Sequence, residues 1–142
     1  WCDWSSDVCS SDLVMILVEM IHDARIVPIG GEHRPDAIRS WMGDSIGRYE
    51  GDTLVVETTN FRPGLAFRGA PDNITLVERF ERVSDTQILY SFEINEPDVF
   101  TAPIRAEVAM SATKGPALEY ACHEGNYSFG NQLQTQRLAE AE

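Results

Sequence analysis

The chain has 142 residues, a formal net charge of −12 and three cysteines. That length fits one domain and is too short for two ordinary domains. A hydrophobic fraction of 43% and a charged fraction of 24% are typical of a globular protein and exclude a disordered, collagen-like or coiled-coil chain. The acidic excess argues against nucleic acid and anionic lipid surfaces as main partners. The apolar run at 13–20 is too short for a membrane span and contains Glu19.

The first 13 residues differ in character from the rest. The tripeptide Ser-Ser-Asp occurs twice, at 5–7 and at 10–12. From Asp3 to Leu13 the string matches one reading frame of a common sequencing-library adapter, and such a long match by chance is very improbable. We therefore predict that residues 1–13 are a non-native segment and exclude them from fold reasoning. The alternatives are an acidic Ser-rich arm, or two cysteines, Cys2 and Cys9, that await a metal or a disulfide.

This interpretation changes what the composition describes. Without the segment, Cys122 is the only cysteine, so no disulfide framework within the chain is expected. Ten of the 11 basic residues are arginine, as in GC-rich bacterial coding, which suggests a fragment from environmental bacterial DNA. We expect residues 14–142 to form a single β-rich domain, truncated at its N-terminus and lacking an upstream part of its own chain. The localisation signal, if the protein has one, would lie in that part.

Alternation of apolar and polar residues dominates the remainder, beginning with an apolar strand at 14–20 and a shorter strand at 25–29. Residues 48–58 indicate a hairpin that turns at Gly51-Asp52, because glycine accepts a positive φ. A second hairpin is predicted from 74–83 and 87–94. Half-buried strands follow at 104–111 and at 118–122. We expect the strand at 14–20 to be buried more continuously than the others.

These elements predict a mainly β fold, an antiparallel meander of about eight strands arranged as a barrel-like or sandwich domain. Helix is minor: 35–42 fits a short turn between Pro35 and Gly43, and 131–141 fits a short C-terminal helix. The irregular segment at 60–73 is longer than most connections. It is either a binding loop or an ordinary crossover.

Three histidines, His22, His33 and His123, are candidate ligands for a transition metal such as zinc. Their spacing matches no compact metal motif. The alternative is that each histidine makes a local hydrogen bond in its own loop. Glu124 and Asp23 are the candidate catalytic bases of a metal-assisted mechanism.

Other reactive side chains give weaker indications. Cys122 and His123 are adjacent on a predicted strand and point to opposite sides, so a buried structural cysteine is favoured over a nucleophile. Asp44 and the other carboxylates in turns are expected to satisfy backbone N–H groups. Arg62 and Arg68 in the long loop could clamp an anionic ligand, with surface solvation as the alternative.

Four strings carry a family resemblance: 19–25 (EMIHDAR), 41–45 (WMGDS), 50–61 (EGDTLVVETTNF) and 119–127 (EYACHEGNY). Together they resemble the C-terminal half of a family of uncharacterised, often exported bacterial proteins. The resemblance covers residues 14 to about 130 and implies a longer N-terminus and an exported or periplasmic location. His22 and His123 lie inside these strings, as does Tyr127, a third candidate for ligand binding with Arg62 and Arg68. The tail at 131–142 departs from the family pattern.

The sequence therefore predicts a β-rich domain that binds a small ligand or a metal ion at its loop-rich end. Two alternatives stay open. One is a metal-assisted enzyme that uses His22, His33 and His123. The other is a structural module of a larger exported protein, which should expose apolar residues near the strand at 14–20.

Overall fold

The computed structural model describes residues 12–63, 73–116, 118, 120 and 127–140. Within this part the chain forms seven strands, a short 3₁₀ helix and one α-helix. The bounds are β1 Leu13–Val18, η1 Glu19–Ile21, β2 Asp23–Pro28, β3 Asp44–Glu50, β4 Thr53–Thr59, β5 Thr75–Ser84, β6 Gln87–Asn95, β7 Ile104–Ser111 and α1 Ser128–Glu140.

The chain divides into two compact units. The larger is formed by Trp1–Leu17 and Ala24–Gly115, and the smaller by Val18–Asp23 and Pro116–Glu142. Each is described by itself. All seven strands have most of their residues in the larger unit, which is called the β unit below.

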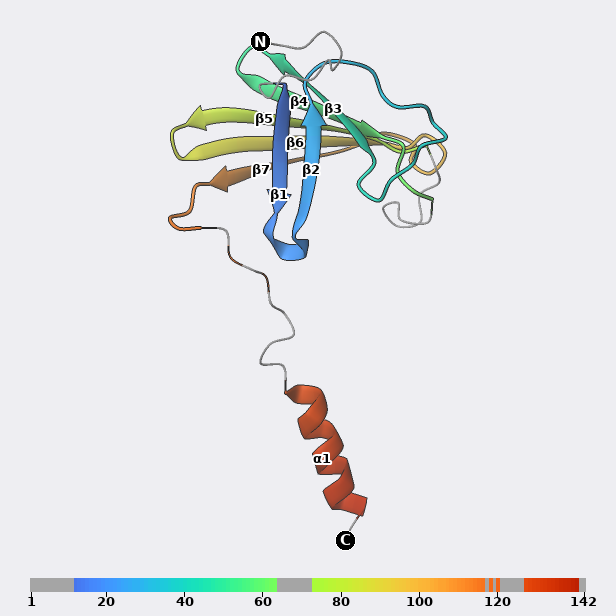
Figure 1. Ribbon diagram of the computed structural model, residues 1–142, viewed down its shortest axis with the longest axis vertical. Helices are drawn as coiled ribbons and strands as arrows, with labels where there is room; N and C mark the ends of the chain where they lie inside the picture. The colour runs from blue at the N-terminus through green and yellow to red at the C-terminus, as the bar shows by residue number, and fades with distance from the viewer. Residues whose placement is uncertain (1–11, 64–72, 117, 119, 121–126, 141–142) are drawn as a thin grey trace, which may run out of the picture. The chain divides into compact units, whose positions relative to one another are not determined.

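The β unit contains a five-stranded antiparallel sheet in the order β3-β4-β5-β6-β7 (Figure 1). Consecutive strands pair throughout, and tight turns connect β3 to β4 and β5 to β6. β3 and β4 join through Gly51-Asp52, with Glu50 opposite Thr53 and Gly51 at a φ of 63°. A positive φ at the first central residue is what a two-residue hairpin of this kind requires.

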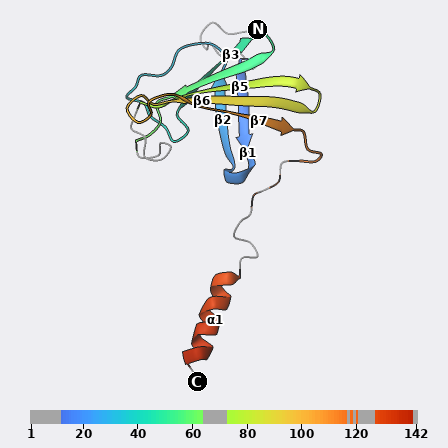
Figure 2. The same ribbon diagram turned by 180° about the vertical axis from the view of Figure 1, so that it is seen from behind.

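Alternation along the strands gives the sheet two chemically different faces. One of them is called the apolar face. On this face Val56 of β4 pairs with Gly47 of β3, and Leu54 of β4 pairs with Phe80 of β5. Phe80 pairs in turn with Tyr90 of β6. The hairpin formed by β1 and β2 runs across this face, as Figures 1 and 2 show from opposite sides. Val27 of β2 and Val56 are fully buried, and burial of a valine side chain stabilises the fold by about 1.5–3 kcal/mol.

Gly47 is the point where β2 comes closest to the sheet. A Cβ atom at this position would lie 2.8 Å from Ile29 Cδ1 and 3.0 Å from Val27 Cγ1. The Gly30 N–H donates to the Gly47 carbonyl at 2.8 Å, and Ile29 forms a parallel bridge with Gly47. The end of β2 therefore adds to the free edge of β3 and joins the hairpin to the sheet.

The predicted mainly β class is confirmed. The two antiparallel sheets do not close into a barrel and are consistent with a sandwich. The strands at 25–29, 48–58, 74–94 and 104–111 are found close to their predicted bounds, and the turn at 35–42 forms without becoming a helix. The predicted strand at 118–122 lies mostly outside the described residues, and neither Leu118 nor Tyr120 belongs to a strand.

The predicted burial of the first strand is wrong. β1 ends at Val18, and its residues alternate between exposed and half-buried side chains. Met15 is 62% exposed and Leu17 53% exposed, and on the neighbouring strand Ile26 is 51% exposed. A two-stranded hairpin covers the sheet with one side only, so its other side faces solvent among the described residues.

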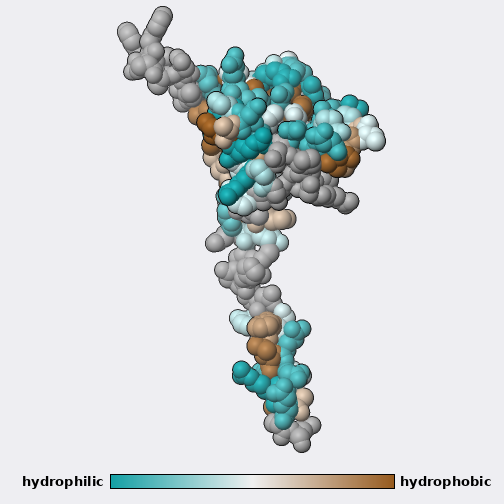
Figure 3. Space-filling view, turned by 90° about the vertical axis from the view of Figure 1, so that its right-hand side faces the viewer, coloured by the Kyte–Doolittle hydropathy of each residue, from teal (hydrophilic) through white to brown (hydrophobic). Residues whose placement is uncertain are grey.

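In the smaller unit, α1 spans Ser128–Glu140, which confirms the predicted C-terminal helix with an earlier start. None of its residues is buried. Phe129, Leu133 and Leu138 are exposed, and Figure 3 shows hydrophobic residues on the helix surface. Among the described residues, no helix has the length and apolar character needed to cross a membrane.

Candidate functional site: a cleft at the edge of β3

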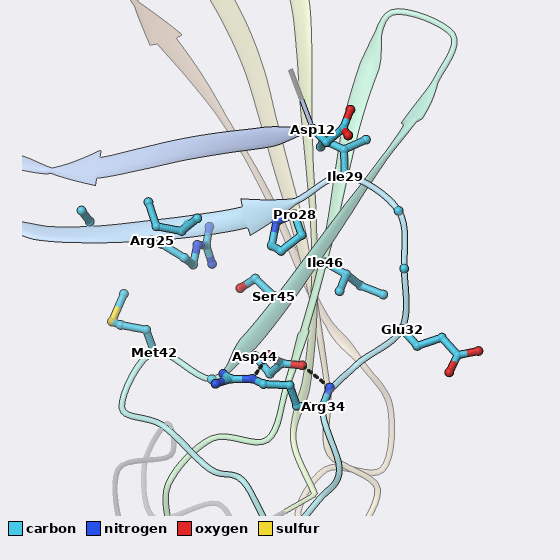
Figure 4. A pocket seen from close by; sticks show the side chains of 15 residues that line it. Asp12, Arg25, Pro28, Ile29, Glu32, Arg34, Met42, Asp44, Ser45 and Ile46 are labelled. Atoms are coloured by element: carbon cyan, nitrogen blue, oxygen red, sulfur yellow. Dashed lines mark hydrogen bonds and ion pairs between the residues drawn. The ribbon is translucent and has the colours of Figure 1, made fainter. Parts of the chain in front are cut away.

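The β unit contains a cleft of about 620 Å³ between the end of β2 and the beginning of β3 (Figure 4). Pro28, Ile29, Met42 and Ile46 supply apolar lining. Charged lining comes from Asp12, Arg25, Glu32, Arg34 and Asp44. A cleft of this size with a few polar groups among apolar ones has the character of a small-molecule site.

The cleft exists because the chain leaves the sheet after Ile29. Gly30 and Gly31 have φ values of 81° and 91°, which glycine adopts without steric cost. The segment that follows diverges from β3, and the edge of β3 from Asp44 to Ile46 is left as one wall of the cleft. β3 is also an outer strand of the five-stranded sheet, so this edge has no neighbouring described strand.

The backbone of Ser45 contributes a donor and an acceptor to this wall. The Gly47 carbonyl points away from β4, because it accepts from Gly30. In an antiparallel pair the direction of the backbone groups alternates with a period of two, so the N–H and C=O of Ser45 also point away from β4. The Ser45 hydroxyl is used elsewhere, in a 2.8 Å hydrogen bond with Thr58 Oγ1. A ligand in the cleft can therefore meet the backbone of Ser45.

Asp44 is the fixed charge at one end of the cleft. Its Oδ2 accepts from the Arg34 backbone N–H at 2.8 Å and lies 3.0 Å from His33 Nδ1, and its Oδ1 accepts from Arg34 Nε at 2.6 Å. Burial alone would raise the pKa of Asp44, but these hydrogen bonds outweigh burial and hold the pKa below its usual value of 3.8. The expectation that Asp44 satisfies backbone N–H groups is confirmed.

Arg25 forms the inner side of the cleft and a buried ion pair. Its NH1 lies 2.6 Å from Glu78 Oε2, and Glu78 is 5% exposed. Tyr90 donates its hydroxyl hydrogen to Glu78 Oε1 at 2.8 Å. Burial, the charge of Glu78 and this hydrogen bond raise the pKa of Tyr90 well above its usual value. The three residues connect β2, β5 and β6 across the apolar face.

Of the predicted metal ligands, His33 lies beside the cleft and contacts two carboxylates. Its Nε2 is buried, has no hydrogen-bond partner within the usual geometry and lies 3.5 Å from Glu57 Oε1. His22 belongs to the smaller unit, where it has a left-handed φ of 55° and its Nε2 accepts from the Tyr120 N–H at 3.3 Å. His123 lies outside the described residues.

The remaining predicted site residues are not brought together in the part of the chain that can be described. Arg62 stacks on Trp41 in the β unit. Asp23 and Tyr127 are exposed residues of the smaller unit. Arg68, Cys122 and Glu124 lie outside the described residues. Within the described ranges, no group of three or more His, Cys, Asp or Glu side chains is arranged to hold a metal ion.

Several residues of the cleft were not singled out from the sequence. Arg25 stands in the string at 19–25 and Met42 in the string at 41–45, so both strings pointed near the site without indicating their roles. Ser45 is the last residue of the string at 41–45, but nothing in that string indicates that its backbone would line a cleft beside the end of β2. Comparison with protein-family models, with curated proteins and with solved structures found no match to this chain.

Proposed function

We propose that the β unit is a small-ligand-binding module and that the cleft at the edge of β3 is its binding site. The observation that carries this proposal is the 620 Å³ cleft itself, in which apolar side chains adjoin fixed charges and a backbone donor–acceptor pair. Asp44 and Arg25 are each held by partners on other strands or loops, so the polar groups are preorganised. Preorganisation reduces the ordering cost of binding.

The ligand that fits is small and partly apolar, with a group that can both donate and accept a hydrogen bond, such as an amide. The ion pairs leave little uncompensated charge at the inner side of the cleft, since Arg34 pairs with Asp44 and Arg25 with Glu78. Binding should therefore depend on shape and on hydrogen bonds to the backbone of Ser45 more than on net charge.

A substitution that fills the cleft tests the proposal. Ala24 is exposed on β2 and lines the cleft, so Ala24→Trp should occupy it without disturbing the core. A fragment library rich in small amides would be screened by ligand-observed NMR on the unmodified chain. The hits should lose at least about tenfold in affinity, equal to about 1.4 kcal/mol, in Ala24→Trp.

Ala109→Trp is the matched control, because Ala109 is also an exposed strand residue but lies on β7, away from the cleft. The site would be excluded if the hits bound both variants equally. It would also be excluded if no fragment bound the unmodified chain.

A second candidate function is favoured by the outer side of the β1–β2 hairpin. Met15, Leu17 and Ile26 are each more than half exposed there, as expected for a structural module that packs against a further part of a larger protein. If so, Leu17→Gln should leave the melting temperature of the chain unchanged within about 2 °C and reduce its binding of a hydrophobic dye. A clear loss of stability would place Leu17 in the core and remove this candidate.

The described residues contain no cluster of side chains that would support the metal-assisted enzyme. The resemblance to an exported bacterial family stays a prediction.

A further inference from the structure

A second set of side chains outside the cleft combines an exposed aromatic ring with a cation. The Cζ atom of Arg62 lies 4.9 Å from the centroid of the Trp41 ring. Trp41 is 61% exposed, and Arg62 is exposed as well. Neither residue lines the cleft, although Met42, which follows Trp41, does. This pair is called the Trp41–Arg62 platform below.

The backbone beneath the platform is fixed. The Arg62 N–H donates to the Ser40 carbonyl at 2.8 Å, and the Ser40 N–H donates to the Asn60 carbonyl at 3.2 Å. Asn60 is buried, adopts a left-handed φ of 53° and donates its side-chain amide to the Arg34 carbonyl at 2.9 Å. Two segments far apart in the sequence are thus tied together directly under the platform, which preorganises it.

Arg62 also differs in its partners from six of the other described arginines of the β unit. Six described arginines of this unit lie within 3.1 Å of a carboxylate oxygen: Arg25, Arg34, Arg48, Arg79, Arg82 and Arg105. The guanidinium of Arg62 makes no ion pair with a described residue, although the chain carries 23 acidic residues against 11 basic ones. In such an acidic chain, an arginine whose guanidinium contacts a ring and no carboxylate of a described residue retains the capacity to bind an external anion.

We infer that the Trp41–Arg62 platform binds a carboxylate attached to a flat ring. A guanidinium over an indole uses its face for the stacking contact, so its N–H donors remain at its edge for bidentate contact with a carboxylate. The exposed part of the Trp41 ring offers a flat apolar surface to the ring of the same ligand. Two sources share this chemistry: an aromatic acid and a sugar acid.

The two sources are distinguished by titrating the full chain with indole-3-acetate and, separately, with digalacturonate. Tryptophol and cellobiose serve as the uncharged counterparts. The readout is the indole N–H signal of Trp41 in a ¹H–¹⁵N spectrum, assigned from its loss in Trp41→Phe. At least one of the acids should shift this signal saturably, with a Kd of about 0.1–1 mM, as expected for a ligand of this size. The matching uncharged compound should bind at least about tenfold more weakly, since it lacks the charge-assisted hydrogen bonds.

Arg62→Gln should weaken that binding by about tenfold or more, whereas Arg82→Gln, at an exposed arginine on β5, should leave it unchanged. The inference would be overturned if neither acid saturated the signal at 10 times the upper Kd. It would also be overturned if an acid and its uncharged counterpart bound equally, or if the two substitutions had equal effects. Circular dichroism of Arg62→Gln checks that the fold is retained, and Arg62→Lys should bind with intermediate affinity because it keeps the charge but lacks the planar fork. Because this platform lies outside the cleft, Ala24→Trp should not affect it, so the two sites can fail independently.

Discussion

At the scale of single residues, buried charges with several partners hold the β unit together. Asp44 and Glu78 are both nearly inaccessible to solvent, and both meet an arginine at 2.6 Å. Removal of one member of a buried pair leaves the other without compensation, which is far more destabilising than loss of an exposed pair. Glu78 is such a case, because its partner Arg25 is also largely buried. Arg34 is half exposed, so the prediction for Asp44 rests on the hydrogen bonds that Asp44 accepts.

Asp44→Asn should lower the free energy of unfolding at pH 7 by about 2–3 kcal/mol, because the hydrogen bonds it loses are charge-assisted. The folded chain holds the pKa of Asp44 below 3.8, so this stabilisation is present above that pH and disappears as the pH falls through the lowered pKa. Urea unfolding between pH 3 and 7 should show a flatter acid limb for Asp44→Asn. Asp36→Asn, at an exposed position in the loop that precedes β3, is the control and should match the unmodified chain.

Glu78→Gln should cost about 3 kcal/mol, because it leaves the charge of Arg25 buried without a partner. Glu93→Gln is a matched comparison, since Glu93 pairs with Arg105 at a similar 2.7 Å but on a solvent-exposed part of the sheet. That substitution should cost less than about 1 kcal/mol. Equal costs in urea unfolding would show that burial does not distinguish the two pairs.

At the scale of elements, the close packing around β3 depends on the absence of side chains at Gly43, which lies against Thr58 and Thr59 of β4, and at Gly47, which lies against the end of β2. Gly43 has a φ of 72°, and a Cβ there would lie 2.6 Å from the backbone carbonyl oxygen of Thr59. The Cβ of an alanine at Gly47 would instead meet the ends of side chains, at 2.8 Å and 3.0 Å. Side-chain ends can shift, whereas a paired backbone cannot.

Gly43→Ala should therefore destabilise the chain by about 3 kcal/mol, and Gly47→Ala by about 1–2 kcal/mol. Thermal unfolding of both variants checks that Gly43→Ala is the more destabilising of the two substitutions. In the Ile29→Ala background, Gly47→Ala should cost less, because the closest contact has been removed. An additive double mutant would mean that Ile29 is not what opposes the new methyl group.

The elements also show what the sequence could and could not reveal. The alternation at 88–94 and 104–111 reports a local property, the two-sided environment of a strand, and the predicted strands are confirmed. The apolar run at 14–20 predicts a buried strand because all of its residues except Glu19 are apolar. Its actual exposure arises because the β1–β2 hairpin covers the sheet with one side only, which is a long-range property.

The candidate site was less accessible to prediction for the same reason. The cleft arises where β2 leaves the edge of β3, and Asp44 acquires its role from Arg34 and His33, which the sequence does not mark as its partners. The position of Arg62 in the long loop predicts that it could bind an anion. The sequence does not indicate its contact with Trp41, because Trp41 lies 21 residues earlier in the chain. Pairing between distant segments is what a single sequence conceals.

At the scale of the whole molecule, the protection of backbone amides from hydrogen exchange should differ strongly between elements. Val55, Val56 and Thr58 of β4 are fully buried, whereas no residue of α1 is buried. An isolated helix of 13 residues is marginal in water. Hydrogen–deuterium exchange should therefore show β4 amides protected by close to the global free energy of unfolding, and α1 amides exchanging within seconds to minutes. Equal protection of the two elements would show that α1 is stabilised by contacts beyond the helix itself.

The exposed side of β1 also affects the behaviour of the protein in concentrated solution. Among the described strands, β1 pairs with β2 alone, and an uncharged strand with an open edge is a template for association between chains. The net charge of −12 keeps copies apart by mutual repulsion. Added salt shortens the range of that repulsion to about 8 Å at 0.15 M and about 3 Å at 1 M. Light scattering should thus show aggregation that increases with ionic strength and is suppressed by Met15→Lys, so the protein will be easiest to handle in dilute buffer.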